Sequence, residues 1–164
     1  MMMNPSSKIV ISLVKTMKNA KDSIIYADNY FTSHALVKFL RDNYQCLFTG
    51  AARENRICKP HLKETSEMNK QSTKRGDIDF QSLDWILALK WINNKVITIS
   101  SSGTGVEPMS PVSRYDKHSK SEKDVFCPNV IKCYNSNMGE LIKVACKSTC
   151  TRPHCELVAG TCKF

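Results

Sequence analysis

Four cysteines near the C-terminal end of the sequence are the residues best suited to bind a metal ion. Cys146, Cys150, Cys155 and Cys162 fall within seventeen residues, and His154 lies among them. Thiolates and imidazoles are the ligands that Zn²⁺ prefers, and four of them close a tetrahedral shell. The spacing is not the paired C-x-x-C of a zinc ribbon. It leaves two alternatives open: a zinc site in which Cys155 or His154 is the third ligand, and a tail with free thiols.

The redox state of these thiols follows from the N-terminal region. Its short apolar stretch is interrupted by Lys8, Lys15 and Lys18, and no small-residue cleavage site follows. This pattern predicts no signal peptide, so we expect reduced thiols rather than a disulfide framework. No apolar run approaches the about 18 residues of a membrane-spanning helix, so we expect no membrane partner.

The charge of the chain favours a polyanionic partner. Its 164 residues fit one domain and include 24 Lys and Arg against 15 Asp and Glu, a net charge of +9. On charge alone, nucleic acid is the first candidate and an acidic membrane surface the second, with simple solubility as the alternative. Of these partners we expect DNA and no membrane. The segment 53–75 is rich in basic residues, and we expect an exposed loop there. Its candidate DNA contacts are Arg53, Arg56, Lys59, Lys74 and Arg75.

Apolar periodicity predicts a layered α/β fold in the first third of the chain. Helices are expected at 7–19 and 33–44, because apolar residues recur at helical spacing behind serine or threonine caps. Short β-branched and aromatic runs at 23–27 and 46–50 predict strands. The order helix, strand, helix, strand implies parallel strands joined by a crossover helix.

Asp28 directly follows the first predicted strand. The carboxyl end of a strand is where α/β sheets place their ligand sites, so this carboxylate is a candidate functional group. Aspartate is also common where a strand turns. Capping of the following turn is therefore the alternative.

The second half of the sequence predicts a β-hairpin followed by irregular structure. Strands at 85–91 and 96–100 flank a turn at Asn93-Asn94. We further expect a loop at 103–121, an extended segment at 125–133 and the start of a helix at 135–143. The aromatic residues expected to pack between hairpin and core are Phe80, Trp85, Trp91 and Phe126. The histidines expected on the surface are His34, His61 and His118.

Four ordered stretches resemble motifs of the piggyBac-type transposases and the host proteins derived from them. Ile25 to Ser33 is similar to a strand-ending D-N-[FWY]-[FY]-T-S signature, and Gly50 to Arg56 to T-G-T-x-R-x-N-R. Leu89 to Ser101 is similar to an A-L-x-W-x-D-N-K hairpin, and Pro128 to Gly139 to P-x-x-V-x-x-Y-N-x-x-M-G-G-V-D. Because the four stretches follow one another in the family's order, the resemblance is far more specific than any single motif.

The resemblance implies an incomplete RNase H-like core of the DDE transposase type, with a β-rich insertion whose hairpin lies outside the core layer. The implied division is a partial core at 1–52, a basic loop and insertion at 53–134, and the start of a last core helix with a short cysteine-rich tail at 135–164. The tail is similar to a shortened copy of the family's zinc domain. The family cuts and joins DNA with three aspartates that hold two Mg²⁺ ions, and Asp28 matches the second of them.

Two departures from the family's pattern bear on activity. The first aspartate belongs to a strand upstream of the first helix expected here, and Ile142 stands at the position of the third. Since one carboxylate does not hold two metal ions, we expect a nuclear transposase-derived domain without cleavage activity. A domesticated nuclear DNA-binding or protein-interaction module is the alternative. A working nuclease would need acids from a second copy or from a longer transposase-derived partner.

The cysteine tail carries the first testable prediction. If the four thiols form a site, the purified chain binds one Zn²⁺, and binding weakens as falling pH protonates the thiolates. Metal analysis under reducing conditions measures this, and Cys150→Ser should abolish stoichiometric zinc. A zinc-free chain with four titratable tail thiols contradicts the site.

Overall fold

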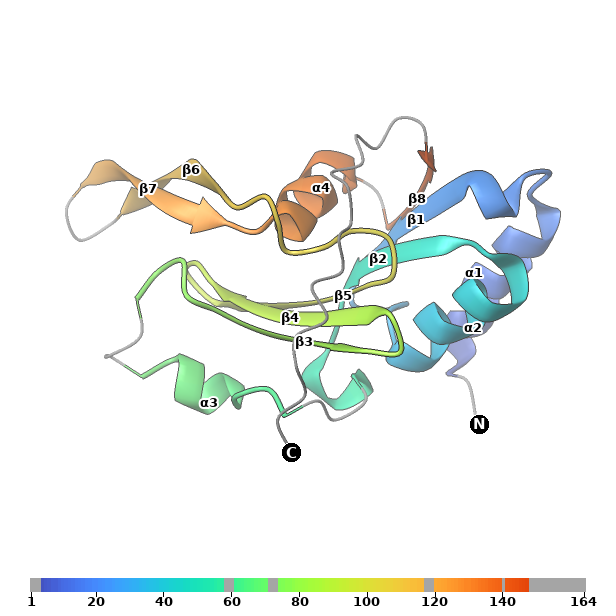
Figure 1. The fold of residues 1–164 in the computed structure, drawn as a ribbon, viewed down its shortest axis with the longest axis horizontal. Coiled ribbons are helices and arrows are strands. Elements are labelled where there is room, and N and C mark those ends of the chain that lie inside the picture. Colours follow the sequence, from blue (N-terminus) through green and yellow to red (C-terminus); the bar gives the residue numbers. More distant parts are fainter. Residues whose placement is uncertain (1–3, 58–60, 71–73, 117–119, 140, 148–164) are drawn as a thin grey trace.

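The computed structural model describes residues 4–57, 61–70, 74–116, 120–139 and 141–147. These residues form a mixed α/β structure with one large sheet and one small sheet (Figure 1). The elements in chain order are α1 (Pro5–Thr16), β1 (Ser23–Ala27), α2 (His34–Tyr44), β2 (Leu47–Ala51), α3 (Thr65–Met68), β3 (Ile78–Leu83), β4 (Ile86–Ile92), β5 (Val96–Ser101), β6 (Ser110–Asp116), β7 (Ser121–Cys127), α4 (Asn129–Asn137) and β8 (Ile142–Cys146). The large sheet has the order β3-β4-β5-β2-β1-β8, and β6 pairs with β7.

The β1–α2–β2 unit forms the centre of the large sheet. The two strands are parallel, with Ile24 opposite Leu47. Ser33 caps α2, because its hydroxyl accepts the backbone N–H of Leu36 at 3.3 Å. Gln45 ends the helix in the left-handed conformation, with φ 51°. The predicted parallel pair and its crossover helix are confirmed.

Helix α1 precedes this unit and lies beside α2. It begins at Pro5, whose fixed φ suits a first helical turn, and it buries Val10 and Val14 one turn apart. The predicted end near residue 19 is wrong, because the backbone is already extended at Met17 and turns toward β1. No helix in the described ranges is long and apolar enough to cross a membrane.

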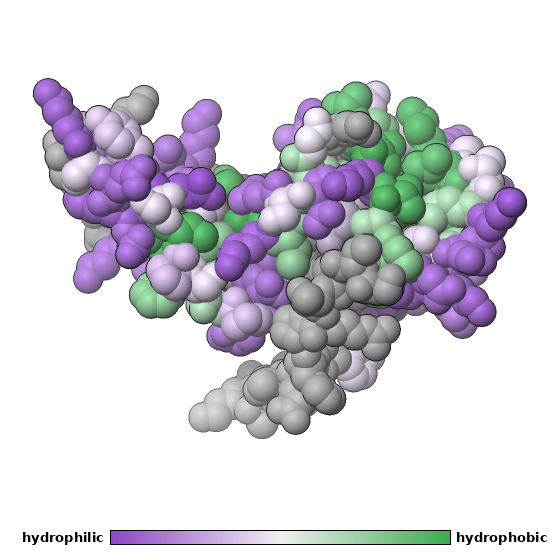
Figure 2. Space-filling view, turned by 90° about the horizontal axis from the view of Figure 1, so that it is seen from above, coloured by the Kyte–Doolittle hydropathy of each residue, from purple (hydrophilic) through white to green (hydrophobic). Residues whose placement is uncertain are grey.

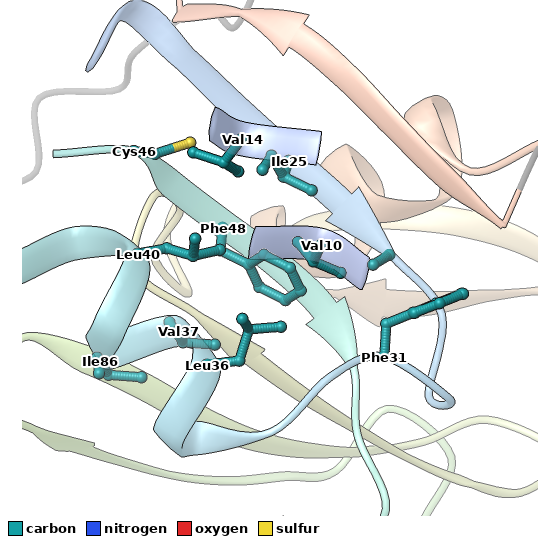
Figure 3. Packing of buried hydrophobic residues seen from close by; sticks show 11 residues of the cluster. Val10, Val14, Ile25, Phe31, Leu36, Val37, Leu40, Cys46, Phe48 and Ile86 are labelled. Carbon is teal, nitrogen blue, oxygen red and sulfur yellow. The ribbon is translucent and has the colours of Figure 1, made fainter. Parts of the chain in front are cut away.

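The main core lies between the two helices and the sheet. Figure 3 shows the ring of Phe48 pointing from β2 toward α1 and α2. Ile86 of β4 belongs to the same cluster, so the core extends beyond the first two strands. The buried members are Val10, Val14, Ile25, Ala27, Phe31, Leu36, Val37, Leu40, Cys46, Phe48 and Ile86.

The β4–β5 hairpin is part of the large sheet, and the expectation that it lies outside the core layer is wrong. β5 pairs antiparallel with β2, with Thr49 opposite Ser101 and Ala51 opposite Ile99. All seven residues of β4 are buried, which requires cover on both faces of the strand. The predicted hairpin itself is confirmed, with its turn at residues 93–95.

The chain after the hairpin differs most from expectation. The predicted loop at 103–121 contains β6, and the predicted extended segment at 125–133 is the end of β7 followed by α4. Pro128 lies at the N-cap of α4, where its missing N–H costs nothing. The predicted helix at 135–143 is also wrong, because α4 ends at Asn137 and β8 forms the edge strand beside β1. β8 and β1 are more than 100 residues apart in the sequence, so a local sequence pattern could not predict that they pair.

Burial corrects the predicted roles of several rings. Trp91 is fully buried, and its indole N–H donates to the Phe126 carbonyl at 2.9 Å. Phe80, Trp85 and Phe126 are instead 51%, 68% and 61% exposed. Phe80 lies on the edge strand β3, and Trp85 lies in the turn between β3 and β4 with φ 62°. His34, expected on the surface, is buried at the start of α2, where desolvation lowers its pKa.

Two phenylalanines test the core. Phe48→Ala should lower the free energy of unfolding by about 3–5 kcal/mol, because it removes a fully buried ring and leaves a cavity. Phe80→Ala is the matched control and should cost less than about 1 kcal/mol, since that ring is half exposed. Urea unfolding followed by circular dichroism measures both. Equal losses would contradict this core.

Candidate functional site

Asp28 lies at the carboxyl end of β1, where it organises a tight turn. Its carbonyl accepts the backbone N–H of Phe31 at 3.3 Å and of Thr32 at 3.2 Å, and also the Thr32 hydroxyl at 2.8 Å. Its Oδ1 accepts the backbone N–H of Tyr30 at 2.5 Å. The carboxylate therefore caps its own turn, as one reading of the sequence predicted, while its half-buried side chain stays accessible at the end of the sheet.

Gly50 allows this turn to lie against β2. A Cβ at this position would lie 2.2 Å from Thr32 Oγ1 and 2.7 Å from the Ala27 carbonyl oxygen. Any side chain at Gly50 would push the Asp28 turn away from the parallel strand pair. The glycine therefore sets the position of the carboxylate relative to the ends of β1 and β2.

Tyr134 of α4 brings a phenol to the same end of the sheet. Its pKa is raised first by burial and second by the negative charge of Asp28, while hydrogen bonding to the Ala51 backbone acts in the opposite direction. The two perturbing groups end β1 and β2, so α4 carries the phenol over the carboxyl ends of both parallel strands. A carboxylate and a neutral phenol thus share this edge.

The position that matches the family's third aspartate lies next to Asp28 but is apolar. Ile142 of β8 is directly opposite Ala27, and the neighbouring Leu141 carbonyl accepts the Asp28 N–H at 3.2 Å. Within the described ranges, no three His, Cys, Asp or Glu side chains group closely enough to hold a metal ion. This donor set does not fit two Mg²⁺ ions.

The basic segment after β2 is attached to the Asp28 turn. Arg56 Nη1 donates to the Tyr30 carbonyl at 2.5 Å. Of the candidate DNA contacts, Arg53 and Lys74 are exposed, Arg56 is half-buried against this turn, and Lys59 lies outside the described residues. Arg75 instead bonds the β4–β5 turn, with Nη2 donating to Asn93 Oδ1 at 2.7 Å. Arg56 and Arg75 therefore belong to different surfaces.

Sequence reasoning missed an ion pair between a buried lysine and a half-exposed glutamate of the basic segment. The Lys90 side chain is 3% exposed, and its ammonium donates to Glu54 Oε1, to the Lys63 carbonyl at 2.7 Å and to Thr65 Oγ1 at 3.4 Å. Hydrogen bonds from Lys90 and then Thr65 hold the pKa of the Glu54 carboxyl below its ordinary value. The signal in the sequence is a lysine inside the apolar run ILALKWI.

Two further contacts tie the same segment to the sheet. The backbone N–H groups of His61 and Lys63 donate to Gln81 Oε1 at 2.8 Å and to Asp79 Oδ2 at 2.6 Å. The expected exposed loop is therefore docked on β3 and β4, although most of its side chains do face solvent.

The tail cysteines are largely outside the described part of the chain. Cys146 ends β8 and is exposed. Cys150, Cys155 and Cys162, together with His154, lie outside the described residues, so the zinc site stays a prediction.

Comparison with known proteins identifies the family. The family model described as Transposase IS4 matches residues 2–157. The human PiggyBac transposable element-derived protein 3 is 36% identical over 115 residues, 68% of this chain and 18% of that protein. This chain belongs to the piggyBac-type transposase family. The human PiggyBac transposable element-derived protein 2 is 32% identical over 117 residues, 70% of this chain and 19% of that protein.

The fold is also that of a piggyBac transposase. The transposase of a synaptic complex with hairpin DNA matches with a TM-score of 0.52 at 21% identity, over 79% of this chain and 24% of that chain. The chain thus spans less than a fifth of the two human relatives and about a quarter of the solved one.

The four stretches that resemble piggyBac motifs are connected by contacts in the folded chain. The second stretch contacts the first through Arg56 and the third through the Glu54–Lys90 pair. The fourth supplies Tyr134, whose pKa is raised by burial and by the negative charge of Asp28. The piggyBac motifs are therefore linked to one another, and the first, second and fourth lie at the carboxyl ends of β1 and β2.

The Glu54–Lys90 pair gives an asymmetric prediction. Glu54→Gln should lower stability at pH 7 by about 1–2 kcal/mol, because it leaves a buried ammonium without its carboxylate, an effect moderated by the half-exposed position of Glu54. Lys90→Met should cost less, since a similar volume is kept and Glu54 is left in water. Chemical unfolding of both variants measures the difference, and a larger loss in Lys90→Met contradicts it.

The pH dependence follows from the lowered pKa of Glu54. Its folded-state pKa is below the ordinary 4.5, so its contribution is fully present above pH 4.5 and is lost as the pH falls through the folded value. The stability gap between the native chain and Glu54→Gln should therefore close in that acidic range.

Proposed function

We propose that this chain is a piggyBac transposase-derived DNA-binding domain that does not by itself cleave or join DNA. Its net charge of +9 and its fold support the DNA partner, since the matching transposase is in complex with hairpin DNA. The parallel β1–α2–β2 unit beside antiparallel strands also supports the RNase H-like core that the resemblance implies.

The single observation that carries the loss of cleavage is the apolar neighbour of Asp28. Two-metal cleavage needs several carboxylates around ions a few Å apart, because Mg²⁺ prefers oxygen ligands. Here Ile142 lies across from Ala27, where β8 passes the end of β1, and the Asp28 Oδ1 accepts a hydrogen bond from its own turn. Among the described residues, the Asp28 carboxylate and the Tyr134 phenol lie at this end of the sheet.

Lys90 and Arg56 hold in place the basic segment after β2, which we propose as the DNA-binding surface. Lys90 holds the basic segment on the sheet, and Arg56 joins it to the Asp28 turn. We propose that the exposed side chains of this segment, with Arg53 among them, contact the phosphate backbone. Nuclear localisation and a zinc-bound tail belong to the same proposal.

A protein-interaction role is the second candidate, and one surface favours it. The outward face of the β6–β7 hairpin exposes Tyr115 and Phe126, which are 57% and 61% exposed, beside Glu122 and Asp124. Aromatic rings among acids suit a basic protein surface better than DNA. Salt dependence of DNA binding separates the two roles.

Binding and cleavage are tested on the same labelled DNA duplex. The chain should bind, and the affinity should fall steeply as salt rises, because phosphate contacts release counterions. With Mg²⁺ or Mn²⁺ present, the bound DNA should stay intact. An electrophoretic assay reports both properties.

Two variants control this assay. Nicking that is lost in Asp28→Ala but kept in Asp22→Ala, an exposed aspartate elsewhere, would overturn the loss of cleavage. Absence of DNA binding at low salt would overturn the DNA-binding role and favour the protein-interaction surface.

A further inference from the structure

One face of the β6–β7 hairpin carries two positively charged side chains directly opposite each other. Figure 1 shows the hairpin extending from α4 over the end of the large sheet that holds the β4–β5 turn. In its ladder Arg114 lies directly opposite Lys123, and two like charges in that position destabilise an antiparallel pair. Asp116 relieves part of the repulsion through its ion pair with Lys123 at 2.6 Å.

This face is the inner one, turned toward the body of the molecule. Arg114 and Val112 are two residues apart in β6 and share one face with Val125, which is buried. Tyr115 and Phe126 lie on the opposite face and point outward. Gly76, with φ 95°, lies under the hairpin: a Cβ there would be 3.2 Å from Val125 Cγ1. The chain just before β3 therefore runs close beneath the inner face.

Arg75 brings a third cation to the hairpin. Its Nη1 donates to the Tyr115 carbonyl of β6 at 3.5 Å, and its Nη2 donates to Asn93 Oδ1. Arg75 comes from a different part of the chain, and its bond to Tyr115 attaches it to β6, the strand that carries Arg114. Arg114 in turn lies opposite Lys123 in the ladder.

Both arginines have unused donors. The Nε of Arg75 and the Nε of Arg114 are buried and have no hydrogen-bond partner within the described part of the chain. A buried donor without a partner is costly and points to a missing acceptor. The Nε and Nη groups of an arginine form a fork that matches two oxygens of a phosphate.

We propose that Arg75, Arg114 and Lys123 form a phosphate-binding site on the inner face of the β6–β7 hairpin. The site deepens the proposed DNA-binding function and rests on it for the source of the phosphate, which is either the DNA backbone or a free phosphate ion. Figure 2, seen from above, shows the outward face of the hairpin lobe at the left, which is mostly hydrophilic, and the apolar side chains gathered at the right; the site lies on the opposite face of the hairpin. A bound phosphate supplies acceptors to the unpaired donors and offsets the repulsion between Arg114 and Lys123.

Arg114→Gln tests the site without removing a hydrogen bond of the described structure. Because the variant removes a like-charge pair, its melting temperature without phosphate should rise by about 1–3 °C. A purely structural arginine would give a fall instead. Inorganic phosphate should raise the melting temperature of the native chain and of the control Lys15→Gln, an exposed lysine on α1, but not of Arg114→Gln.

DNA binding distinguishes the source of the phosphate. A plot of log affinity against log salt should have the same negative slope for the native chain and for Lys15→Gln. In Arg114→Gln the slope should be shallower by the amount that corresponds to about one phosphate contact. Arg114→Lys keeps the charge but not the two-pronged guanidinium. Compared with Arg114→Gln, it should regain most of the salt dependence of DNA binding but less of the rise in melting temperature with phosphate.

The outcomes separate the two proposals. Stabilisation by phosphate that needs Arg114, in a chain that does not bind DNA, supports the site with free phosphate as its ligand and overturns the DNA-binding function alone. DNA binding that Arg114→Gln leaves unchanged, without phosphate stabilisation, overturns the site alone.

Discussion

The buried ammonium of Lys90 is the constraint on which the arrangement around Asp28 depends. A charged group placed inside β4 is tolerated only where acceptors surround it, because an unpaired buried charge costs several kcal/mol. Glu54, the Lys63 carbonyl and Thr65 supply these acceptors. To do so, the described residues at both ends of the segment, 54–57 and 61–65, must lie over the sheet, although the composition of the segment is that of a solvated loop.

The position of this segment determines the shape of the edge above β1 and β2. Arg56 follows Glu54 within one turn and bonds the carbonyl of Tyr30, so the docked segment also holds the turn that Asp28 caps. Gly50 admits the turn from the other side. The piggyBac-like motifs are thus linked by contacts with one another, and the Asp28 carboxylate is held in its turn beside Ile142 of β8.

In the β6–β7 hairpin, unlike at Lys90, a positive charge lies opposite another positive charge. An isolated two-stranded ribbon is marginal in water, and this one is held by the Trp91 indole, Val125 and Arg75. Yet it also carries Arg114 opposite Lys123, and the Nε of Arg114 is buried without a hydrogen-bond partner among the described residues. A surface that weakens its own element in this way is expected where binding, rather than stability, has shaped the residues.

Local pattern was sufficient for the β1–α2–β2 unit, for the hairpin of β4 and β5, and for placing Asp28 after a strand. These features depend on residues within one or two turns of each other: the Ser33 cap, the apolar run before Asp28 and the Asn93-Asn94 turn. The resemblance to piggyBac motifs identified the same candidate carboxylate and the apolar Ile142. No local signal indicated that β5 joins β2, that β8 covers the edge of β1, or that Glu54 is the partner of the buried Lys90. Those contacts join residues 30 to more than 100 positions apart, and they form because buried strand edges and buried charges must find partners wherever the chain provides them.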